Sequence, residues 1–159
     1  MRSGLILSIA SLTLLLVLGC AREETEAELA ERVRQAQAEQ VASAEAQYDA
    51  SVFDTLTWVS PEARLERGAV VWRASCEKCH GGQGAGNGPF AVQEQMAVPS
   101  FLAEGWLYVG DLDGIRRATY VGHEGGMPNW GLHLKVPYRD VDAVSGYISE
   151  VLVAPTGEQ

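Results

Sequence analysis

The chain has 159 residues, 47% of them hydrophobic and 21% charged, and its formal net charge is −9. This length is sufficient for one globular domain with a core of its own. The excess of carboxylates argues against nucleic acid and anionic lipid surfaces as partners of the body of the protein. It is compatible with an electropositive face on a protein partner.

The first twenty residues have the pattern of an export signal. Arg2 precedes fourteen uncharged residues, 5–18, a run that is short for a membrane span of about 20 residues and typical of a signal-peptide core. The run ends in VLGC, which resembles the lipobox of bacterial lipoproteins. We therefore expect residues 1–19 to be a lipoprotein signal peptide and Cys20 to carry a lipid anchor. The chain would then lie outside the cytoplasm, on the periplasmic side of a bacterial membrane, as it would with an uncleaved anchor.

An acidic segment separates this signal from the rest of the chain. Residues 20–57 contain three arginines and nine carboxylates, a net charge of −6. Within them, residues 22–48 lack Gly and Pro and are rich in the helix formers Ala, Glu and Gln, so we expect a helix with a thin apolar stripe. We interpret 20–57 as a solvated, lipid-anchored spacer, because an alanine-rich stripe buries little area. The alternative is a helix that docks on a partner subunit.

The remaining residues, 58–159, are expected to form one domain. Its first helix is predicted to begin after Ser60, the N-cap, with Pro61 at the first helical position. The helix is expected to run to about Cys76. Its predicted buried stripe contains Leu65, Ala69 and Trp72.

A C-x-x-C-H motif stands at the end of this helix, with Cys76, Cys79 and His80. The spacing is typical of covalent attachment of a c-type haem, because the two thiols lie one helical turn apart and the histidine is placed as the proximal iron ligand. A structural zinc site would need four ligands, and a thioredoxin-like dithiol would need a βαβ context that the flanking sequence lacks. Cys20, the only other cysteine, is assigned to the lipid, so no thiol is left over.

A glycine-rich run occupies residues 81–88, with five glycines in eight positions. It lacks the preceding strand and the Gly-Lys-Ser/Thr ending of a phosphate-binding loop, so we expect it to turn the chain tightly beside the porphyrin. Pro89 follows the run. Because a ligand histidine needs an acceptor for its second ring nitrogen, we expect the Pro89 carbonyl to accept a hydrogen bond from His80.

Two further helices complete the prediction. One covers residues 112–121, begins after Asp111 and stops at Gly122, and the last runs from about 140 to 153. We expect the apolar face of the last helix to pack against the first. No alternating strand pattern occurs in the sequence, and the predicted fold class is therefore all-α.

Met127 is the predicted sixth iron ligand. It lies 47 residues after the motif histidine in the sequence GGMPNW, where a glycine pair and Met-Pro form a rigid loop that can direct the thioether at the iron. Met96 and His123 are the alternatives, while His133 is expected at the surface or behind the ligands. Trp106, Trp130 and Tyr120 are expected to pack in the haem crevice, with a hydrogen bond from Trp130 to a propionate as a further hypothesis.

The motifs CEKCH, GGQGAGNGP, VPSF and GGMPNW together resemble those of class I c-type cytochromes. More narrowly, they resemble the single-haem modules in subunits of bacterial oxidases and related respiratory complexes. The resemblance covers about residues 61–153 and implies a small helical bundle around one covalently attached haem, with one porphyrin edge exposed for electron exchange. By position it implies thioether links at Cys76 and Cys79, iron ligation by His80 and Met127, and a haem-lining role for Pro99.

These features predict a membrane-tethered electron carrier with one haem c and no catalytic residues. Its donor would be a quinol-oxidising complex or a dehydrogenase, and its acceptor a terminal oxidase or another cytochrome. No small-molecule substrate or nucleic acid is expected. An alternative is a fixed haem subunit of a larger membrane respiratory complex. A haem enzyme or gas sensor is less favoured, because it would need an open sixth position and distal groups that the sequence lacks.

Overall fold

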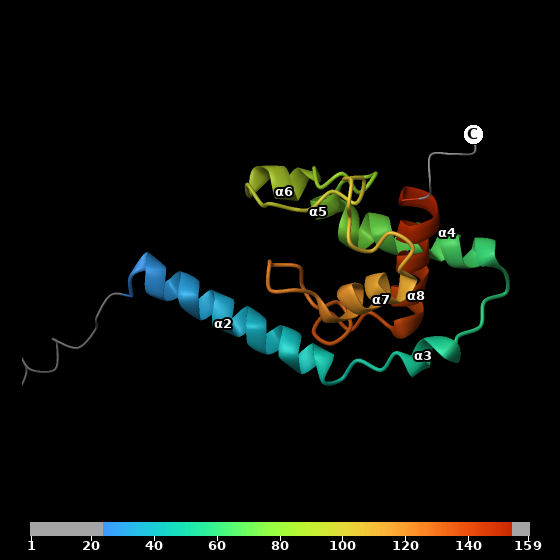
Figure 1. Cartoon of the computed structure of the whole chain (residues 1–159), viewed down its shortest axis with the longest axis horizontal. Coiled ribbons are helices and arrows are strands. Elements are labelled where there is room, and N and C mark those ends of the chain that lie inside the picture. The colour runs from blue at the N-terminus through green and yellow to red at the C-terminus, as the bar shows by residue number, and fades with distance from the viewer. Residues whose placement is uncertain (1–23, 154–159) are drawn as a thin grey trace, which may run out of the picture. The chain divides into compact units, whose positions relative to one another are not determined.

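The computed structural model describes residues 24–153, which form helices joined by loops (Figure 1). The predicted signal peptide and Cys20 lie outside the described residues. Within 24–153 there is no strand, and no helix is long and apolar enough to cross a membrane. This confirms the all-α fold class for the described part of the chain. The described residues divide into two units, 24–35 and 36–153.

The four helices expected from the sequence are present, and two short helices, at residues 51–54 and 89–93, were not expected. In chain order they are α2 (Glu26–Glu45), α3 (Ser51–Asp54), α4 (Pro61–Val71), η1 (Trp72–Cys76), α5 (Glu77–His80), α6 (Pro89–Gln93), α7 (Leu112–Val121), α8 (Tyr138–Tyr147) and η2 (Ile148–Leu152). The elements η1 and η2 are single π-helical turns that continue α4 and α8. The first and last helices predicted for residues 58–159 therefore both end in a widened turn, a feature that often occurs at functional sites.

Residues 24–35 belong to the first unit and are helical for local reasons. Thr25 caps α2: its Oγ1 accepts a hydrogen bond from the Glu28 N–H at 3.2 Å, and the Glu28 carboxylate accepts one from the Thr25 N–H at 3.0 Å. One turn further on, Arg34 pairs with Glu31. The helix predicted within residues 22–48 is thus observed as α2.

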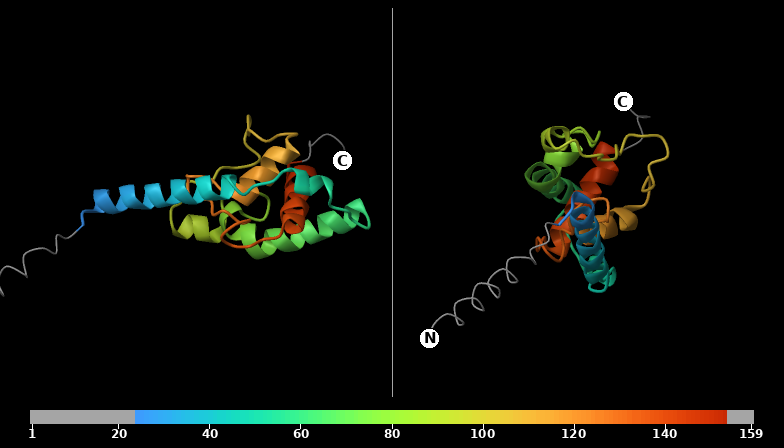
Figure 2. Two further views of the ribbon diagram at one scale, coloured as in Figure 1. Left: turned by 90° about the horizontal axis from the view of Figure 1, so that it is seen from below. Right: turned by 90° about the vertical axis from the view of Figure 1, so that its left-hand side faces the viewer.

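The packing of α4 on α8 organises the second unit (Figure 2). Ser60 caps α4 by accepting a hydrogen bond from the Ala63 N–H at 3.2 Å, and Pro61 is the first helical residue. Gly68 permits a close approach of the two helices, because a Cβ at this position would overlap the Ala143 carbonyl of α8. The predicted contact between the first and last helices of the domain is therefore confirmed.

Two groups of buried side chains fill the second unit. The first, which we call the cavity-side core, consists of Val71, Trp72, Cys76, Ile115, Val144 and Ile148. The second, which we call the extension core, consists of Ala44, Phe53, Tyr120, Val121 and Val141. Both cores take residues from α7 and α8, and the extension core adds residues that precede α4.

The extension core corrects the expected extent of the spacer. Ala44 is 0% exposed and Phe53 is 6% exposed, although both lie in the segment that was expected to be solvated. Their burial is explained by Tyr120 and Tyr138, whose rings lie 4.7 Å apart between centroids and supply the apolar surface that the thin stripe lacks. The compact unit therefore starts at Ala36 rather than at residue 58.

Polar contacts fasten the same segment to the domain. The Tyr138 hydroxyl accepts a hydrogen bond from the Asp49 N–H at 2.8 Å and lies 3.3 Å from the Gln47 carbonyl, to which it donates. Arg117 of α7 donates from Nε to the Glu45 carboxylate at 3.0 Å. Residues 36–57, which we call the extension, are thus an integral part of the domain.

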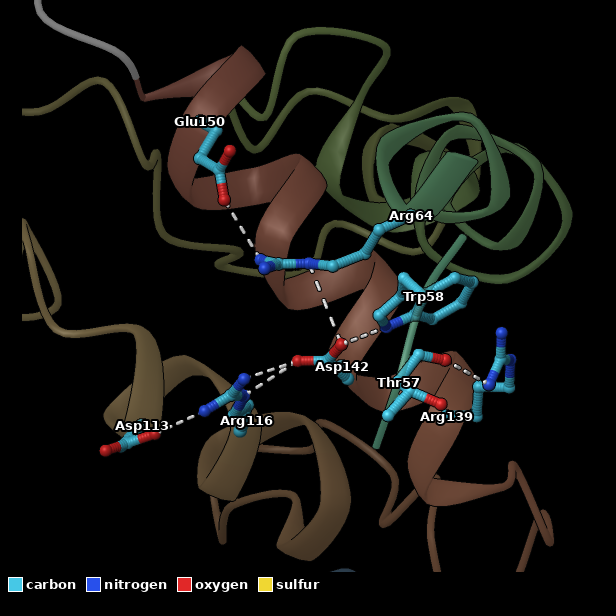
Figure 3. A network of polar contacts seen from close by, with 8 residues as sticks. All are labelled: Thr57, Trp58, Arg64, Asp113, Arg116, Arg139, Asp142 and Glu150. Carbon is cyan, nitrogen blue, oxygen red and sulfur yellow. Dashed lines mark hydrogen bonds and ion pairs between the residues drawn. The ribbon is translucent and has the colours of Figure 1, made fainter. Parts of the chain in front are cut away.

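A buried carboxylate connects Trp58, the residue directly after the extension, to three helices of the domain (Figure 3). Asp142 of α8, which is 2% exposed, accepts hydrogen bonds from Trp58 Nε1 at 2.8 Å and from Arg116 Nε of α7 at 3.0 Å. Arg64 Nε of α4 lies 3.7 Å from the same carboxylate, and Arg116 pairs in addition with Asp113. Because loss of one partner would leave a buried charge uncompensated, this network strongly favours one arrangement of α4, α7 and α8.

Candidate functional site

The C-x-x-C-H motif forms the turn in which η1 passes into α5. Cys76 is the last residue of η1, while Cys79 and His80 complete α5. The helix stops at Gly81, whose φ of +79° reverses the chain and whose N–H donates to the Glu77 carbonyl at 2.8 Å. The two thiols and the imidazole are therefore presented together by one short helical segment.

This segment forms one wall of two cavities, of about 560 Å³ and 230 Å³. The larger volume falls within the range of roughly 300–1,000 Å³ that is usual for ligand and cofactor sites. The lining is mainly apolar and aromatic. The residues that line both cavities are Cys76, His80, Pro99, His123 and Met127.

Met127 reaches the cavities from a loop that is held at both ends. The His123 N–H donates to the Met127 carbonyl at 3.2 Å, which closes the turn before the methionine. After the methionine, the Trp130 N–H donates to the Thr119 carbonyl of α7 at 3.4 Å, and the next N–H donates to the Tyr120 carbonyl at 3.1 Å. The loop is thus anchored along the last turn of α7, with the methionine on the cavity side.

The environment of His80 keeps its imidazole neutral. Burial lowers the pKa of His80 to about 4, with a smaller contribution from the charge of His123. The neutral imidazole is the form that ligates iron. Burial likewise raises the pKa of the Cys76 thiol to about 12, with Cys79 adding to the effect.

The predicted hydrogen bond between His80 and the Pro89 carbonyl is not formed in the structure. The His80 Nδ1 is buried and has no hydrogen-bond partner. Pro89 is the first residue of α6 and lines neither of the two cavities. Pro89 therefore does not provide the acceptor for His80 in this structure.

The described residues around the cavities fit a covalently bound haem. Two thiols and a neutral imidazole lie beside a space of suitable size, and its lining is apolar. Two buried nitrogen atoms of residues that line this space, His80 Nδ1 and Trp72 Nε1, lack a hydrogen-bond partner. Buried polar groups are rarely left unpaired in proteins, so both atoms are consistent with a site for a bound group. The donor set of imidazole and thioether is one that haem iron accepts.

The structure brings together most of the residues singled out from the sequence. Pro99 lines both cavities, and Trp130 and Met96 line the smaller one. His123 lines both, so it occupies the place of a competing ligand, whereas His133 lines neither. The hydrogen bond from Trp130 to a propionate stays a prediction.

An aromatic wall beside His80 contains Trp106, which was expected in the haem crevice, and Phe101, whose contact with the imidazole was not assigned from the sequence. Tyr120, which was also expected in the crevice, lines neither cavity and belongs to the extension core. The Phe101 ring lies 4.8 Å from the His80 ring and 4.8 Å from the Trp106 ring, measured between centroids, and Trp72 lies 5.9 Å from His80. The signal for Phe101 was its place in the VPSF motif, but a loop has no periodicity from which the direction of its side chain could be predicted.

A helical turn with C-x-x-C-H beside an apolar cavity, facing a methionine loop, defines a cytochrome c domain. The chain matches the family described as cytochrome C oxidase, cbb3-type, subunit III over residues 63–148 and belongs to this family. No match was found among curated proteins or among solved structures. A cytochrome c domain implies a covalent haem and electron transfer, and c-type cytochromes are extracytoplasmic. The residues matched exclude the extension, which lies before them.

Proposed function

We propose that the protein carries single electrons through one haem c, attached at Cys76 and Cys79, with His80 and Met127 as axial ligands. The observation that supports this most strongly is that both proposed ligands line the same two cavities next to the attachment motif, although they come from distant parts of the chain. The haem supplies reversible one-electron chemistry at its iron. The chain itself supplies binding, orientation and a dry environment.

The surroundings of the two ligands suit this role. His80 sits on α5 against the aromatic wall, and burial holds its imidazole in the neutral state. Met127 is held by a loop that is hydrogen-bonded to α7, and its soft thioether favours the reduced iron, which raises the reduction potential. Ligands restrained in this way change position little when the charge of the iron changes, which favours electron transfer over substrate chemistry.

The proposed setting is an extracytoplasmic one, with the protein tethered by a lipid at Cys20. The donor would be a quinol-oxidising complex or a dehydrogenase, and the family name supports a terminal oxidase as acceptor. The same name also supports the alternative, a fixed haem subunit of a larger membrane complex. No catalytic residue is proposed in either case.

A redox titration of the purified haem protein tests the electron-carrier function. We expect a single reversible one-electron transition and no rapid binding of carbon monoxide by the reduced form, because both axial positions are filled. Rapid carbon monoxide binding at neutral pH would instead favour the gas sensor or haem enzyme.

A native gel of gently solubilised membranes, stained for haem, distinguishes the carrier from the fixed subunit. A band near the mass of the chain, 17.1 kDa before processing, is expected for a tethered carrier. A band of several times that mass that also contains oxidase subunits would establish the fixed subunit. The tether is tested by replacing residues 1–20 with an export signal that is cleaved without lipidation, which should release the haem protein from these membranes.

A further inference from the structure

Asn129 occupies an unusual position beside the proposed sixth ligand. It lies two residues after Met127 and is only 3% exposed. Its Oδ1 accepts a hydrogen bond from the His133 N–H at 2.8 Å, which closes the turn after the methionine. Its Nδ2 donates to the Gln40 carbonyl of α2 at 3.3 Å. A single buried side chain thus joins the methionine loop to the extension.

The other anchors of the loop come from the region that the family shares. The hydrogen bonds that involve His123, Thr119 and Tyr120 all lie within residues 63–148. Gly122, with φ of +74°, lets α7 end directly against the loop, since a Cβ there would lie 2.6 Å from the Met127 carbonyl oxygen. The bond from Asn129 is different, because Gln40 lies outside the matched residues.

We propose that Asn129 is a positioning residue for Met127 and that it acts by fastening the methionine loop to residues 36–45 of α2. This inference rests on the ligand set of the proposed function. The extension then does more than cover the domain: it provides one of the attachments that hold the thioether toward the iron.

The physical basis is the satisfaction of a buried amide. A hydrogen bond to a backbone carbonyl makes a modest net contribution to stability, and loss of Asn129 also removes the acceptor of the His133 N–H. When Asn129 is removed, the loop loses both its turn-closing acceptor and its link to Gln40. The state in which Met127 has left the iron is thereby favoured relative to the closed state.

The test is the affinity of the ferric haem protein for imidazole, which must displace Met127 to bind. In Asn129→Ala we expect imidazole to bind about tenfold more tightly, since one net hydrogen bond contributes about that factor. The matched control is Arg117→Gln, which removes the pair between α7 and Glu45 of α2 without touching the loop. It should bind imidazole with the affinity of the parent.

A second variant covers the case in which Asn129→Ala does not fold. Asn129→Ser retains an oxygen for the turn before His133, but the shorter side chain does not reach the Gln40 carbonyl. It should also bind imidazole more tightly than the parent. Parental affinity in the folded variants, or an equal increase in Arg117→Gln, would overturn the role of Asn129.

Met127→Ala separates this inference from the proposed function. It should bind imidazole more tightly than either Asn129 variant, because no internal ligand has to be displaced. If Met127→Ala binds imidazole with the affinity of the parent, the ligand set itself is wrong. If only the Asn129 variants behave like the parent, the ligand set stands and the positioning role is overturned.

Discussion

The cavity-side core and the extension core both contain residues of α7 and α8, but they differ in what fills the space beside these residues. Trp72, Cys76, Ile115 and Ile148 of the cavity-side core line the larger cavity, so this core has an open side. No buried member of the extension core lines either of the two cavities. The cavity-side core therefore has room for a bound group, whereas the extension core is packed with protein side chains alone.

The difference shows how one helix can serve two purposes. Along α8 and η2, Val141 belongs to the extension core, while Val144 and Ile148 belong to the cavity-side core. The extension core can stabilise the helices that carry the site without contacting the haem. We therefore expect changes in the extension core to alter stability, and changes at the cavity to alter both haem binding and redox behaviour.

The largest effect is expected from removal of the attachment thiols. In Cys76→Ala combined with Cys79→Ala, no thioether links form, and the open side of the cavity-side core is no longer closed by a covalently held group. Haem staining after denaturing electrophoresis should be lost, and the thermal unfolding midpoint should fall steeply. Ser75→Ala, next to the motif and on the wall of the smaller cavity, should retain the covalent haem.

The same double variant tests whether the two cores differ in their dependence on the haem. If it unfolds cooperatively at the temperature of the parent, the cavity-side core does not depend on the haem, and the distinction between the two cores fails.

A smaller effect is expected from truncation of Phe53, the large buried residue of the extension. Phe53→Ala should lower the free energy of unfolding by about 3 kcal/mol, because it leaves a cavity against Tyr138 and removes the contact with the Arg116 guanidinium. The reduction potential and the haem spectrum should stay those of the parent. The measurements are denaturant unfolding and a redox titration.

The control for this prediction is Val59→Ala, at a side chain that is 93% exposed. It should leave stability within about 0.5 kcal/mol of the parent. A Phe53 variant with full stability would show that the extension does not form a core.

The smallest effect is a dependence of the extension core on alkaline pH. Burial, with a hydrogen bond to Tyr138 and the charge of its ring, raises the pKa of Tyr120 to about 12. A pKa above the usual value of 10.0 means that the folded state favours the neutral phenol, so this stabilisation is complete below pH 10 and is lost as the pH rises toward 12. Absorbance titration of the tyrosinates should show that the component lost in Tyr120→Phe ionises late. A titration in which all tyrosines ionise near pH 10 would contradict this.

The attachment motif and the helices were predictable because their signals are local. Cys76, Cys79 and His80 are close in sequence, and capping residues such as Ser60 and Asp111 mark helix starts directly. Met127 could be proposed because glycine and proline beside it restrict its loop.

The seating of the extension was not predictable from the same kind of signal. Val41, Ala44 and Tyr48 form a stripe too thin to indicate burial, and the surface that covers it comes from Tyr120 and Tyr138, far along the chain. The Asn129 contact was equally hidden, because a lone Asn after Met-Pro gives no indication of a partner in α2. Long-range pairings of this kind depend on the tertiary arrangement, which periodicity does not reveal.

The most direct test of the central claim is the absorption spectrum and reduction potential of Met127→Ala, compared with Met96→Ala. Met96 lines the smaller cavity and is 37% exposed, so it is the matched control for loss of a thioether near the haem. We expect Met127→Ala to lose the charge-transfer band of methionine-ligated ferric haem and to have a lower reduction potential, while Met96→Ala keeps both properties of the parent. Retention of the band and the potential in Met127→Ala would contradict the proposed ligand set.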